Sequence, residues 1–346
     1  GFMVIYLKEE DKTIAIDYRE KAPSAATRDL FLDENGDYDR KKAQFSLLSA
    51  GVPGSVAGFH HALTRYGTLT WEEVLQPAIK LAEDGFVIPH DLANTLASKR
   101  YRERLSADPA ASKVFFKKNK EIYSAGEILV QKDLAWTLKQ LSQNGPEAFY
   151  TGEIAKLIVK EMEKNGGLIT LEDLKNYNVA ERQPLEGNYK GYKVVSMPPS
   201  SSGGTHLIQM LNMLEDFPIK EMGFGSADTI HILAEVMKRA YADRSKYLGD
   251  SDFYKVPSSL TSKKYAKALN KEISLDQVTP SNEVSPGNPY PYESPDTTHF
   301  SVMDSYGNAV SNTYTLNFSY GSGKMIPGTG MLINNEMDDF SSKPGT

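Results

Sequence analysis

Apolar residues alternate with strand spacing near both ends of the chain and recur with helical spacing between them. Two short apolar runs, 2–7 and 12–18, are separated by four polar residues, which predicts a β-hairpin. Near the other end, 297–304 follows a proline-rich loop and has strand character. A turn at 305–308 then predicts a return strand over 309–318. Strands at both ends with helices between them indicate an α/β or α+β fold.

The central part of the chain carries the helical patterns. An apolar stretch at 56–66 closes at Gly67, and Thr70 with Glu73 three residues later fits a capping box. Pro77 either kinks the helix that follows or starts a new one, and Gly85 is a plausible stop. Helical spacing is also found over residues 90–106, 131–143, 151–164, 205–214 and 227–247, the last with Ser226 as the expected N-cap.

Two segments between these helices have a different texture. Residues 189–195 alternate like a single strand, which continues into 197–204, where prolines stop strand pairing and glycines permit close backbone approach.

The geometry of the predicted C-terminal hairpin also indicates which residue lies beside Thr297. With a four-residue turn, opposed residue numbers sum to about 613. Thr297 then faces position 316 within one register step, which places Thr315 beside it.

Composition narrows the function classes. The chain is 40% apolar and 24% charged with a net charge of −6, typical of a globular protein. No basic stripe is present, so nucleic acid is not an expected partner. The absence of cysteine excludes disulfides, thiolate metal sites and cysteine nucleophiles. No apolar run approaches the roughly 18 residues of a membrane span. The strand-like start and loop-like end suggest a piece of a longer polypeptide.

A threonine at a strand start can serve as a nucleophile under one condition. Its hydroxyl needs a base, and cleavage of the chain just before Thr297 would supply its own α-amino group. The ordinary pKa of such an amine, about 7.7–8, suits proton transfer at neutral pH. Taken alone, however, the pattern at Thr297 and Thr298 is also typical of ordinary strands. His299 alone is more typical of a hydrogen-bonded strand histidine than of a base.

Several longer motifs, in the same order along the chain, resemble the bacterial γ-glutamyltransferases, which are N-terminal-nucleophile hydrolases. The segment beginning at Thr297 is similar to the autoprocessing site of that family. The motifs that carry the resemblance are 17–23, 197–204, 241–244, 297–302 with Asp304, 313–317 and 334–340.

The resemblance implies a reaction. The precursor would cut itself between Asp296 and Thr297, and Thr297 would then attack the γ-carbonyl of glutathione or another γ-glutamyl donor. A γ-glutamyl ester would pass to water, an amino acid or a dipeptide, with the α-amino group of Thr297 as base and then acid. Thr315 matches the second threonine of the family, which supports the nucleophile.

The resemblance also implies a binding site for a zwitterion. Arg19 matches the arginine that binds the α-carboxylate, a task that suits its planar fork. Asn317, Glu336 and Asp339 match positions that hold the α-amino group. Without the resemblance, these charged residues would be taken for surface ion pairs or a solvated acidic loop. Residues 200–204 either line the site or only shape a turn.

The fold implied is α+β, a four-layer αββα sandwich formed jointly by large and small subunits cut from one precursor. Residues 1–296 would belong to the large subunit and 297–346 to the start of the small one, together in one domain. Beyond Thr346 the family has a lid loop, a Ser-Ser pair and a Gly-Gly pair. No metal or organic cofactor is expected, because protein groups supply the nucleophile, the base and the charges. The family location is periplasmic or secreted.

Two other functions stay open at this point. Related enzymes with the same nucleophile act as acylases on β-lactam side chains or as poly-γ-glutamate depolymerases. A processing-deficient protein that only binds γ-glutamyl compounds is the alternative outside enzymes. The sequence does not decide between hydrolysis and transfer.

Overall fold

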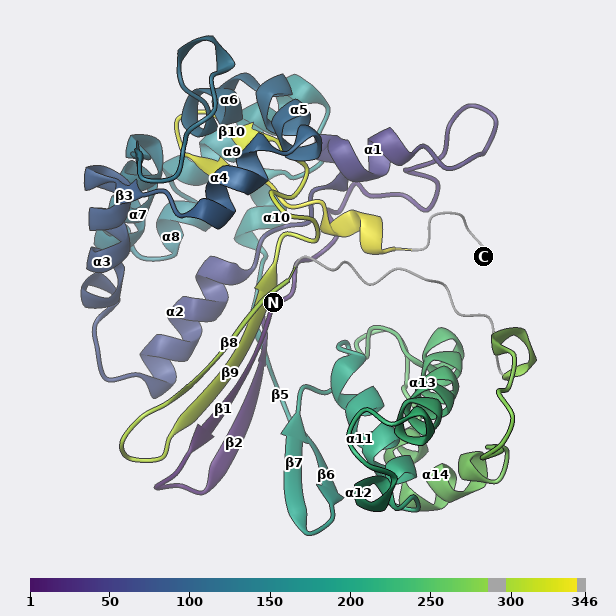
Figure 1. Ribbon diagram of the computed structural model, residues 1–346. Coiled ribbons are helices and arrows are strands. Elements are labelled where there is room, and N and C mark those ends of the chain that lie inside the picture. The colour runs from purple at the N-terminus through teal and green to yellow at the C-terminus, as the bar shows by residue number, and fades with distance from the viewer. Residues whose placement is uncertain (286–296, 341–346) are drawn as a thin grey trace.

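A five-stranded antiparallel sheet lies at the centre of the protein (Figure 1). The computed structural model describes residues 1–285 and 297–340. The sheet joins strands from both ends of the chain, as the hydrophobic pattern predicts. In spatial order its strands are β5 (Ala180–Arg182), β2 (Lys12–Asp17), β1 (Phe2–Leu7), β9 (Ala309–Thr315) and β8 (Thr297–Met303).

The register of the β8–β9 hairpin places Thr297 opposite Thr315. Opposed residue numbers sum to 612 rather than about 613, because five residues, 304–308, connect the strands. Asp304 closes this connection by accepting hydrogen bonds from the backbone N–H of Tyr306 and of Asn308, both at 2.9 Å. The predicted pairing of the two threonines is therefore confirmed for the backbone.

The layers follow the order helix, sheet, hairpin, helix. Helix α2 (Ser55–Tyr66) covers one face of the sheet, and the buried Met3, Ile5, Ile14 and Ile16 pack toward it. Across the other face lies the hairpin of β6 (Leu185–Tyr189) and β7 (Tyr192–Ser196), with α11 (Gly203–Leu214) packed behind it. The order agrees with the predicted αββα arrangement.

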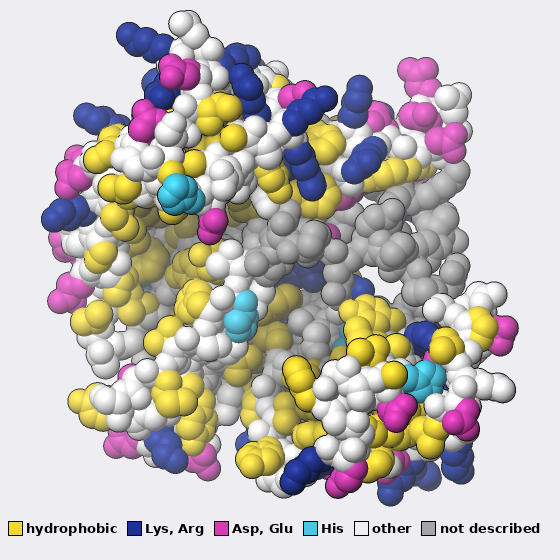
Figure 2. Space-filling model, in the orientation of Figure 1, with side chains coloured by type: hydrophobic (Ala, Val, Ile, Leu, Met, Phe, Trp, Pro, Cys, Tyr) yellow, Lys and Arg dark blue, Asp and Glu magenta, His cyan; other side chains and the backbone are white. Residues whose placement is uncertain are grey.

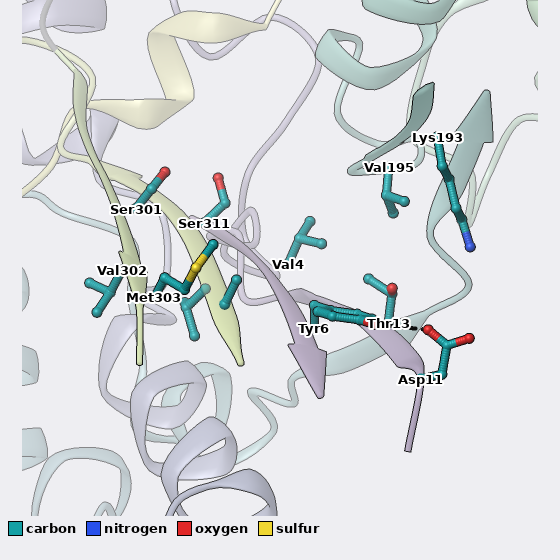
Figure 3. Close-up of a pocket in the computed structure, with 12 residues that line it drawn as sticks. Val4, Tyr6, Asp11, Thr13, Lys193, Val195, Ser301, Val302, Met303 and Ser311 are labelled. Carbon is teal, nitrogen blue, oxygen red and sulfur yellow. Dashed lines mark hydrogen bonds between the residues drawn. The ribbon is translucent and has the colours of Figure 1, made fainter. Parts of the chain in front are cut away.

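An open space of about 490 Å³ separates part of the sheet from β7 (Figure 3). Val4 and Tyr6 of β1 face it from one side, and Lys193 and Val195 of β7 face it from the other. This face of the central sheet is therefore only partly covered by the described residues.

The strand predicted over 189–195 is wrong in its extent. Residues 189–191 form the end of β6 and a turn, with φ of 48° at Lys190 and 88° at Gly191. The first strand of this hairpin was missed because Leu185–Tyr189 contains glycine and asparagine, which weaken the strand signal.

A helical lobe surrounds α9 (Glu153–Asn165), whose buried Ile154, Ile158 and Met162 confirm its predicted apolar face.

The capping box predicted before α3 (Trp71–Asp84) is present. Thr70 Oγ1 accepts from Glu73 N–H at 3.2 Å, and the Glu73 carboxylate accepts from Thr70 N–H at 2.7 Å. Helix α3 continues through Pro77 to Gly85. The helical spacing over 90–106 corresponds to two helices, α4 (His90–Ala97) and α5 (Lys99–Ala107), which are separated at the extended Ser98.

A second lobe is built on α13 (Ala227–Tyr247), and its predicted N-cap is confirmed, since Ser226 Oγ accepts from Thr229 N–H at 3.1 Å. The remaining elements are the α-helices α1 (Arg40–Phe45), α6 (Pro109–Phe115), α7 (Lys132–Asn144), α8 (Glu147–Tyr150), α10 (Leu171–Lys175), α12 (Ile219–Met222) and α14 (Lys263–Asn270), the strands β3 (Phe86–Val87), β4 (Ile128–Leu129), β10 (Met325–Ile326) and β11 (Met331–Leu332), and the 3₁₀ turns η1 (Leu47–Ser49), η2 (Lys118–Lys120), η3 (Ser258–Thr261), η4 (Ser281–Glu283) and η5 (Glu336–Asp339).

Surface charge is mixed rather than segregated. On the face in Figure 2, lysine and arginine side chains are interspersed with aspartate and glutamate. Within residues 1–285 and 297–340, no helix combines the length and the apolar character needed to cross a bilayer.

A buried hydrogen bond ties the end of β2 to β9, and its loss should destabilise the fold. Tyr18 donates to Asn312 Oδ1 at 2.6 Å, and both side chains are fully buried. We expect Tyr18→Phe to lower the free energy of unfolding by about 1–3 kcal/mol, because it leaves a buried acceptor without a donor. Tyr6→Phe is the matched control, since its bond to Asp11 is exposed. Denaturant unfolding measures both, and equal losses would contradict the prediction.

Candidate active site

A pocket of about 450 Å³ opens where the sheet, η5 and the start of α11 meet. Its wall includes Arg19 just after β2, Thr315 and Asn317 at the end of β9, and Glu336 and Asp339 of η5. The five residues predicted to support catalysis or bind substrate, other than Thr297 itself, thus line one pocket although up to 320 positions separate them. The chain folds this way because β1 joins β2 to β9 within the sheet.

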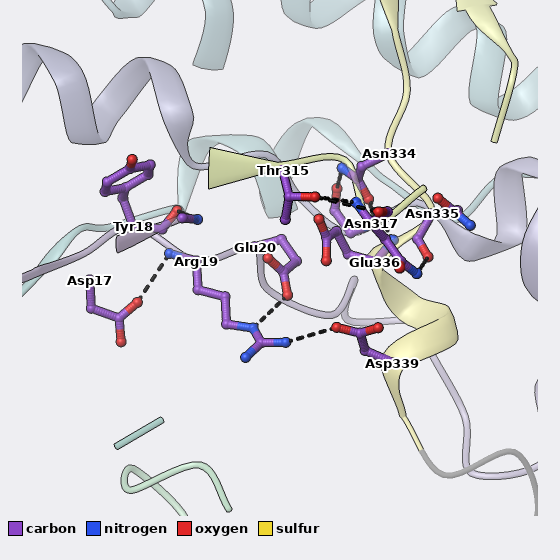
Figure 4. A network of polar contacts seen from close by, with 12 residues as sticks. Asp17, Tyr18, Arg19, Glu20, Thr315, Asn317, Asn334, Asn335, Glu336 and Asp339 are labelled. Carbon is purple, nitrogen blue, oxygen red and sulfur yellow. Dashed lines mark hydrogen bonds and ion pairs between the residues drawn. The ribbon is translucent and has the colours of Figure 1, made fainter. Parts of the chain in front are cut away.

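Arg19 lies between two carboxylates (Figure 4). Its Nε donates to Glu20 Oε1 at 2.8 Å and its Nη2 donates to Asp339 Oδ2 at 3.2 Å. The backbone is fixed as well, since Arg19 N–H donates to Asp17 Oδ1 at 3.0 Å and Tyr177 Oη donates to the Arg19 carbonyl at 2.8 Å. Glu20 is the main reason that the pKa of Arg19 is raised above its ordinary value. The guanidinium is therefore a permanent cation, and about a third of it is exposed to a ligand.

The end of β9 is held by a tight local network. Asn317 has a φ of 71°, and its N–H donates to Thr315 Oγ1 at 3.0 Å. Its side chain donates to the Asn335 carbonyl at 2.9 Å, and Asn335 Oδ1 accepts from Phe318 N–H at 3.2 Å. This network connects β9 to the segment that leads into η5 (Figure 4). It fixes the Thr315 hydroxyl relative to the acidic residues.

Two acidic side chains of η5 have altered pKa values. Glu336 is only 4% exposed, and its Oε1 has no hydrogen-bond partner among the described residues. Burial, then the charges of Glu20 and Asp339, raise the pKa of Glu336 to about 8. Burial also raises the pKa of Asp339 to about 6, against the opposing effect of Arg19. A cation placed here would stabilise both carboxylates.

Three further residues support the site, and sequence reasoning gave none of them a role. Asn334 exchanges two 2.9 Å hydrogen bonds with the backbone of Gly51, which anchors the start of η5. Tyr38 donates to Asp338 Oδ1 at 2.6 Å, next to the Asp339 that accepts from Arg19. The only sequence feature that points to Glu20 is its position next to Arg19. The partner of Asn334 has no sequence signal because it lies 283 positions away.

Residues 201–204 form another wall of the pocket. Ser201, Ser202, Gly203 and Gly204 all line it. Gly204 is also required by close packing, because a Cβ there would lie 2.1 Å from the Met197 carbonyl oxygen. Residues 201–204 therefore line the pocket, and Gly204 also permits the tight turn into α11.

His299 behaves as an ordinary strand histidine in its contacts. Its Nδ1 lies 2.6 Å from Thr313 Oγ1, and its Nε2 lies 3.3 Å from the hydroxyls of Ser301 and Ser311. These hydroxyls satisfy both ring nitrogens, although the ring also lines the pocket.

The predicted nucleophile is placed only by its backbone. Thr297 begins β8 opposite Thr315, whereas its side chain and Asp296 lie outside the described residues. Throughout residues 1–285 and 297–340, no cluster of three His, Cys, Asp or Glu side chains is arranged to hold a metal ion.

Comparison with known proteins identifies the family. The sequence profile of the gamma-glutamyltranspeptidase family matches residues 1–346, and the chain belongs to this family. It is 52% identical over 346 residues to the glutathione hydrolase proenzyme of Escherichia coli (strain K12), covering 100% of this chain and 59% of that protein. It is 39% identical over 343 residues to the acylase ACY 1 proenzyme of Pseudomonas sp. (strain SE83), covering 97% and 60%. The chain thus spans about 60% of the length of these curated relatives.

Solved structures confirm the fold. The gamma-glutamyltranspeptidase of Helicobacter pylori matches with a TM-score of 0.80 and 49% identity, over 83% of this chain and 82% of that one. The cephalosporin acylase of Bacillus halodurans matches with a TM-score of 0.84 and 27% identity, over 99% and 62%. The predicted family and the N-terminal-nucleophile hydrolase fold are both confirmed.

The raised pKa of Glu336 predicts how stability depends on pH. Because the folded-state pKa of about 8 lies above the unfolded value of about 4.3, the unfolded state releases a proton that the folded state keeps. The free energy of unfolding should therefore fall as pH rises between these values. Asp339 contributes only up to about pH 6, so Glu336→Gln should flatten the decline between pH 6.5 and 8. Denaturant unfolding at several pH values measures this, with Glu10→Gln on the exposed turn as control. An unchanged slope in Glu336→Gln would refute the assignment.

Proposed function

We propose that this chain carries the γ-glutamyl site of an enzyme that hydrolyses glutathione and other γ-glutamyl compounds and transfers the γ-glutamyl group to amino acids or dipeptides. The observation that supports this most directly is the pocket that joins Arg19 to Asn317, Glu336 and Asp339 beside the start of β8. The similarity to glutathione hydrolase proenzymes agrees with it.

The two ends of an α-amino acid have matching partners in this pocket. The Arg19 guanidinium, held at its Nε by Glu20, binds the α-carboxylate through its remaining N–H groups. The α-ammonium lies among the side-chain oxygens of Asn317, Glu336 and Asp339, and its charge compensates the unpaired Glu336 carboxylate. A γ-glutamyl group bound in this way extends its γ-carbonyl toward the hairpin that carries Thr297.

The reaction then follows from one cleavage. Hydrolysis of the Asp296–Thr297 peptide bond frees a carboxyl group on Asp296 and the α-amino group of Thr297. The α-amino group takes the hydroxyl proton while Thr297 Oγ bonds to the γ-carbonyl carbon, and the amide C–N bond breaks as that proton passes to the leaving nitrogen. Water or an acceptor amine attacks the resulting ester, gives its proton to the α-amino group, and restores the Thr297 hydroxyl. Residues 1–296 and the polypeptide from 297 onward stay paired as large and small subunits.

The location that the family resemblance implies, periplasmic or secreted, is part of the same proposal. Fractionation of the native host, with an antibody to this chain, tests it.

Thr297→Ala in the full-length protein should abolish both chain cleavage and turnover, because one hydroxyl serves both steps. Intact mass spectrometry and release of nitroaniline from γ-glutamyl-4-nitroanilide measure the two effects. Thr298→Ala is the control, since this neighbour points to the other face of the strand. Retained turnover in Thr297→Ala would contradict the proposal. An uncut, inactive wild-type protein would favour the γ-glutamyl-binding alternative, and turnover of glutaryl rather than γ-glutamyl substrates would favour an acylase.

Arg19→Gln should lower kcat/KM for γ-glutamyl-4-nitroanilide on the order of 10²-fold, chiefly through KM, because a charged pairing with the α-carboxylate is lost. The loss should be much smaller for 4-aminobutyryl-4-nitroanilide, which lacks the α-carboxylate. Arg28→Gln is the control, since this arginine is exposed and its ion pair among the described residues is with Asp29. Equal losses on both donors would show that Arg19 does not contact the carboxylate.

A further inference from the structure

We propose that Arg244 of α13 and the first turn of α11 bind a carboxylate in the other half of the substrate, the peptide that leaves the γ-glutamyl group or accepts it. This inference rests on the proposed function and extends it to substrate selection.

The pocket has a wall that the amino acid head group does not use. Arg244 and residues 201–204 line it together, and they belong to the lobe of α11 and α13 rather than to the central sheet. At about 450 Å³ the pocket has the size of a site for a small ligand rather than for a single functional group. The α-carboxylate and α-ammonium are already matched by Arg19 and the η5 carboxylates, so this second wall faces the rest of the ligand.

The chemistry of this wall is that of an anion site. Helix α11 has 12 residues and starts at Gly203, so its aligned peptide dipoles make its N-terminus positive. Among the described residues, no hydrogen-bond acceptor is found for the backbone N–H of Gly204 or of Thr205. Nothing but Ser201 Oγ, at 3.5 Å, lies near the Cβ position of Gly203, so a ligand can approach this backbone closely.

Arg244 adds a full positive charge to the same wall. The charge of Arg244 acts on Asp339, which lines the same pocket. Burial raises the pKa of Asp339, and this rise is opposed by Arg19 and, more weakly, by Arg244. Arg244 also adds to the effect of burial in lowering the pKa of His206 in the first turns of α11. Arg244 lines the same pocket as the start of α11 and the acidic residues of η5.

Glu336, the proposed partner of the α-ammonium, lies in the same pocket as Arg244. Glu336 lines it, is 4% exposed, and its Oε1 has no partner among the described residues. An ammonium at Glu336 and a carboxylate at Arg244 would place opposite charges on opposite walls. A γ-glutamyl dipeptide has both, because its peptide half ends in a carboxylate.

The test compares donors that differ only in the carboxylate of the leaving group. For the full-length enzyme, kcat/KM is measured with glutathione and with its glycine amide, and with γ-glutamyl-3-carboxy-4-nitroanilide and γ-glutamyl-4-nitroanilide. Arg244→Gln should lower kcat/KM about tenfold to hundredfold for the carboxylated member of each pair. The uncharged members should change by no more than about twofold to threefold, and Arg244→Lys should restore part of the loss because it keeps the charge.

A second arm separates the leaving group from the acceptor. Transfer to glycylglycine and to glycylglycinamide is compared in the same variants. A loss confined to glycylglycine places the carboxylate site with the acceptor, and a loss confined to carboxylated donors places it with the leaving group. Equal losses on charged and uncharged partners would overturn the inference and leave Arg244 as a residue that only adjusts Asp339.

A failure of this inference can be distinguished from a failure of the proposed function. Wild-type turnover of both nitroanilides establishes γ-glutamyl chemistry before any variant is compared. If the wild type turns over neither donor, calorimetric binding of S-methylglutathione and its glycine amide still compares wild type with Arg244→Gln. Equal affinities of the two ligands in the wild type would then refute the carboxylate site.

Discussion

The site depends on three acidic side chains gathered around one guanidinium. Glu20 and Asp339 are hydrogen-bonded to Arg19, whereas Glu336 is buried beside them without such a partner. Carboxylates at this spacing repel one another, and the low exposure of Glu336 strengthens the effect. One guanidinium therefore does not keep all three side chains ionised, and Glu336 keeps its proton up to a pKa of about 8. An ammonium placed beside Glu336 would favour its ionised form, which is the physical reason that the proposed ligand is a zwitterion.

The fold maintains this arrangement by fixing each partner on a different rigid element. Asp17 and Tyr177 fix the backbone of Arg19, while the two hydrogen bonds between Asn334 and Gly51 anchor η5. The backbone segments that carry these side chains cannot move apart without breaking these bonds, two of which are buried. Local strain is also present, since Asn317 occupies the left-handed region at φ 71°. Such strain persists where surrounding contacts determine the conformation, as they do at functional sites.

Local sequence signals predicted the elements that carry the site, and long-range contacts decided the rest. The terminal hairpins, the Thr70 and Ser226 caps and the pairing of Thr297 with Thr315 all follow from spacing over fewer than 20 residues. The union of these hairpins into one sheet has no local signal, because β1 and β9 are some 300 positions apart. The roles of Arg19, Asn317, Glu336 and Asp339 came from family resemblance alone, since acidic and basic residues in loops are ordinarily solvated. The break at Ser98 and the β6–β7 turn were missed because backbone conformation at single residues, rather than hydrophobic period, ends those elements.

The charge arrangement also bears on the choice between γ-glutamyl and glutaryl substrates within one fold. Acylase relatives share the scaffold at 27–39% identity, so the fold does not separate the two activities. A glutaryl group has the terminal carboxylate but no ammonium, and it would bring another negative charge beside Glu336 and Asp339. Leaving a buried carboxylate without a partner costs several kcal/mol unless it takes up a proton. Because Glu336 has a pKa of about 8 and keeps its proton at neutral pH, an ammonium that binds beside it would favour the charged carboxylate, whereas a glutaryl group would not. In the proposed site, charge rather than shape would therefore separate the two groups.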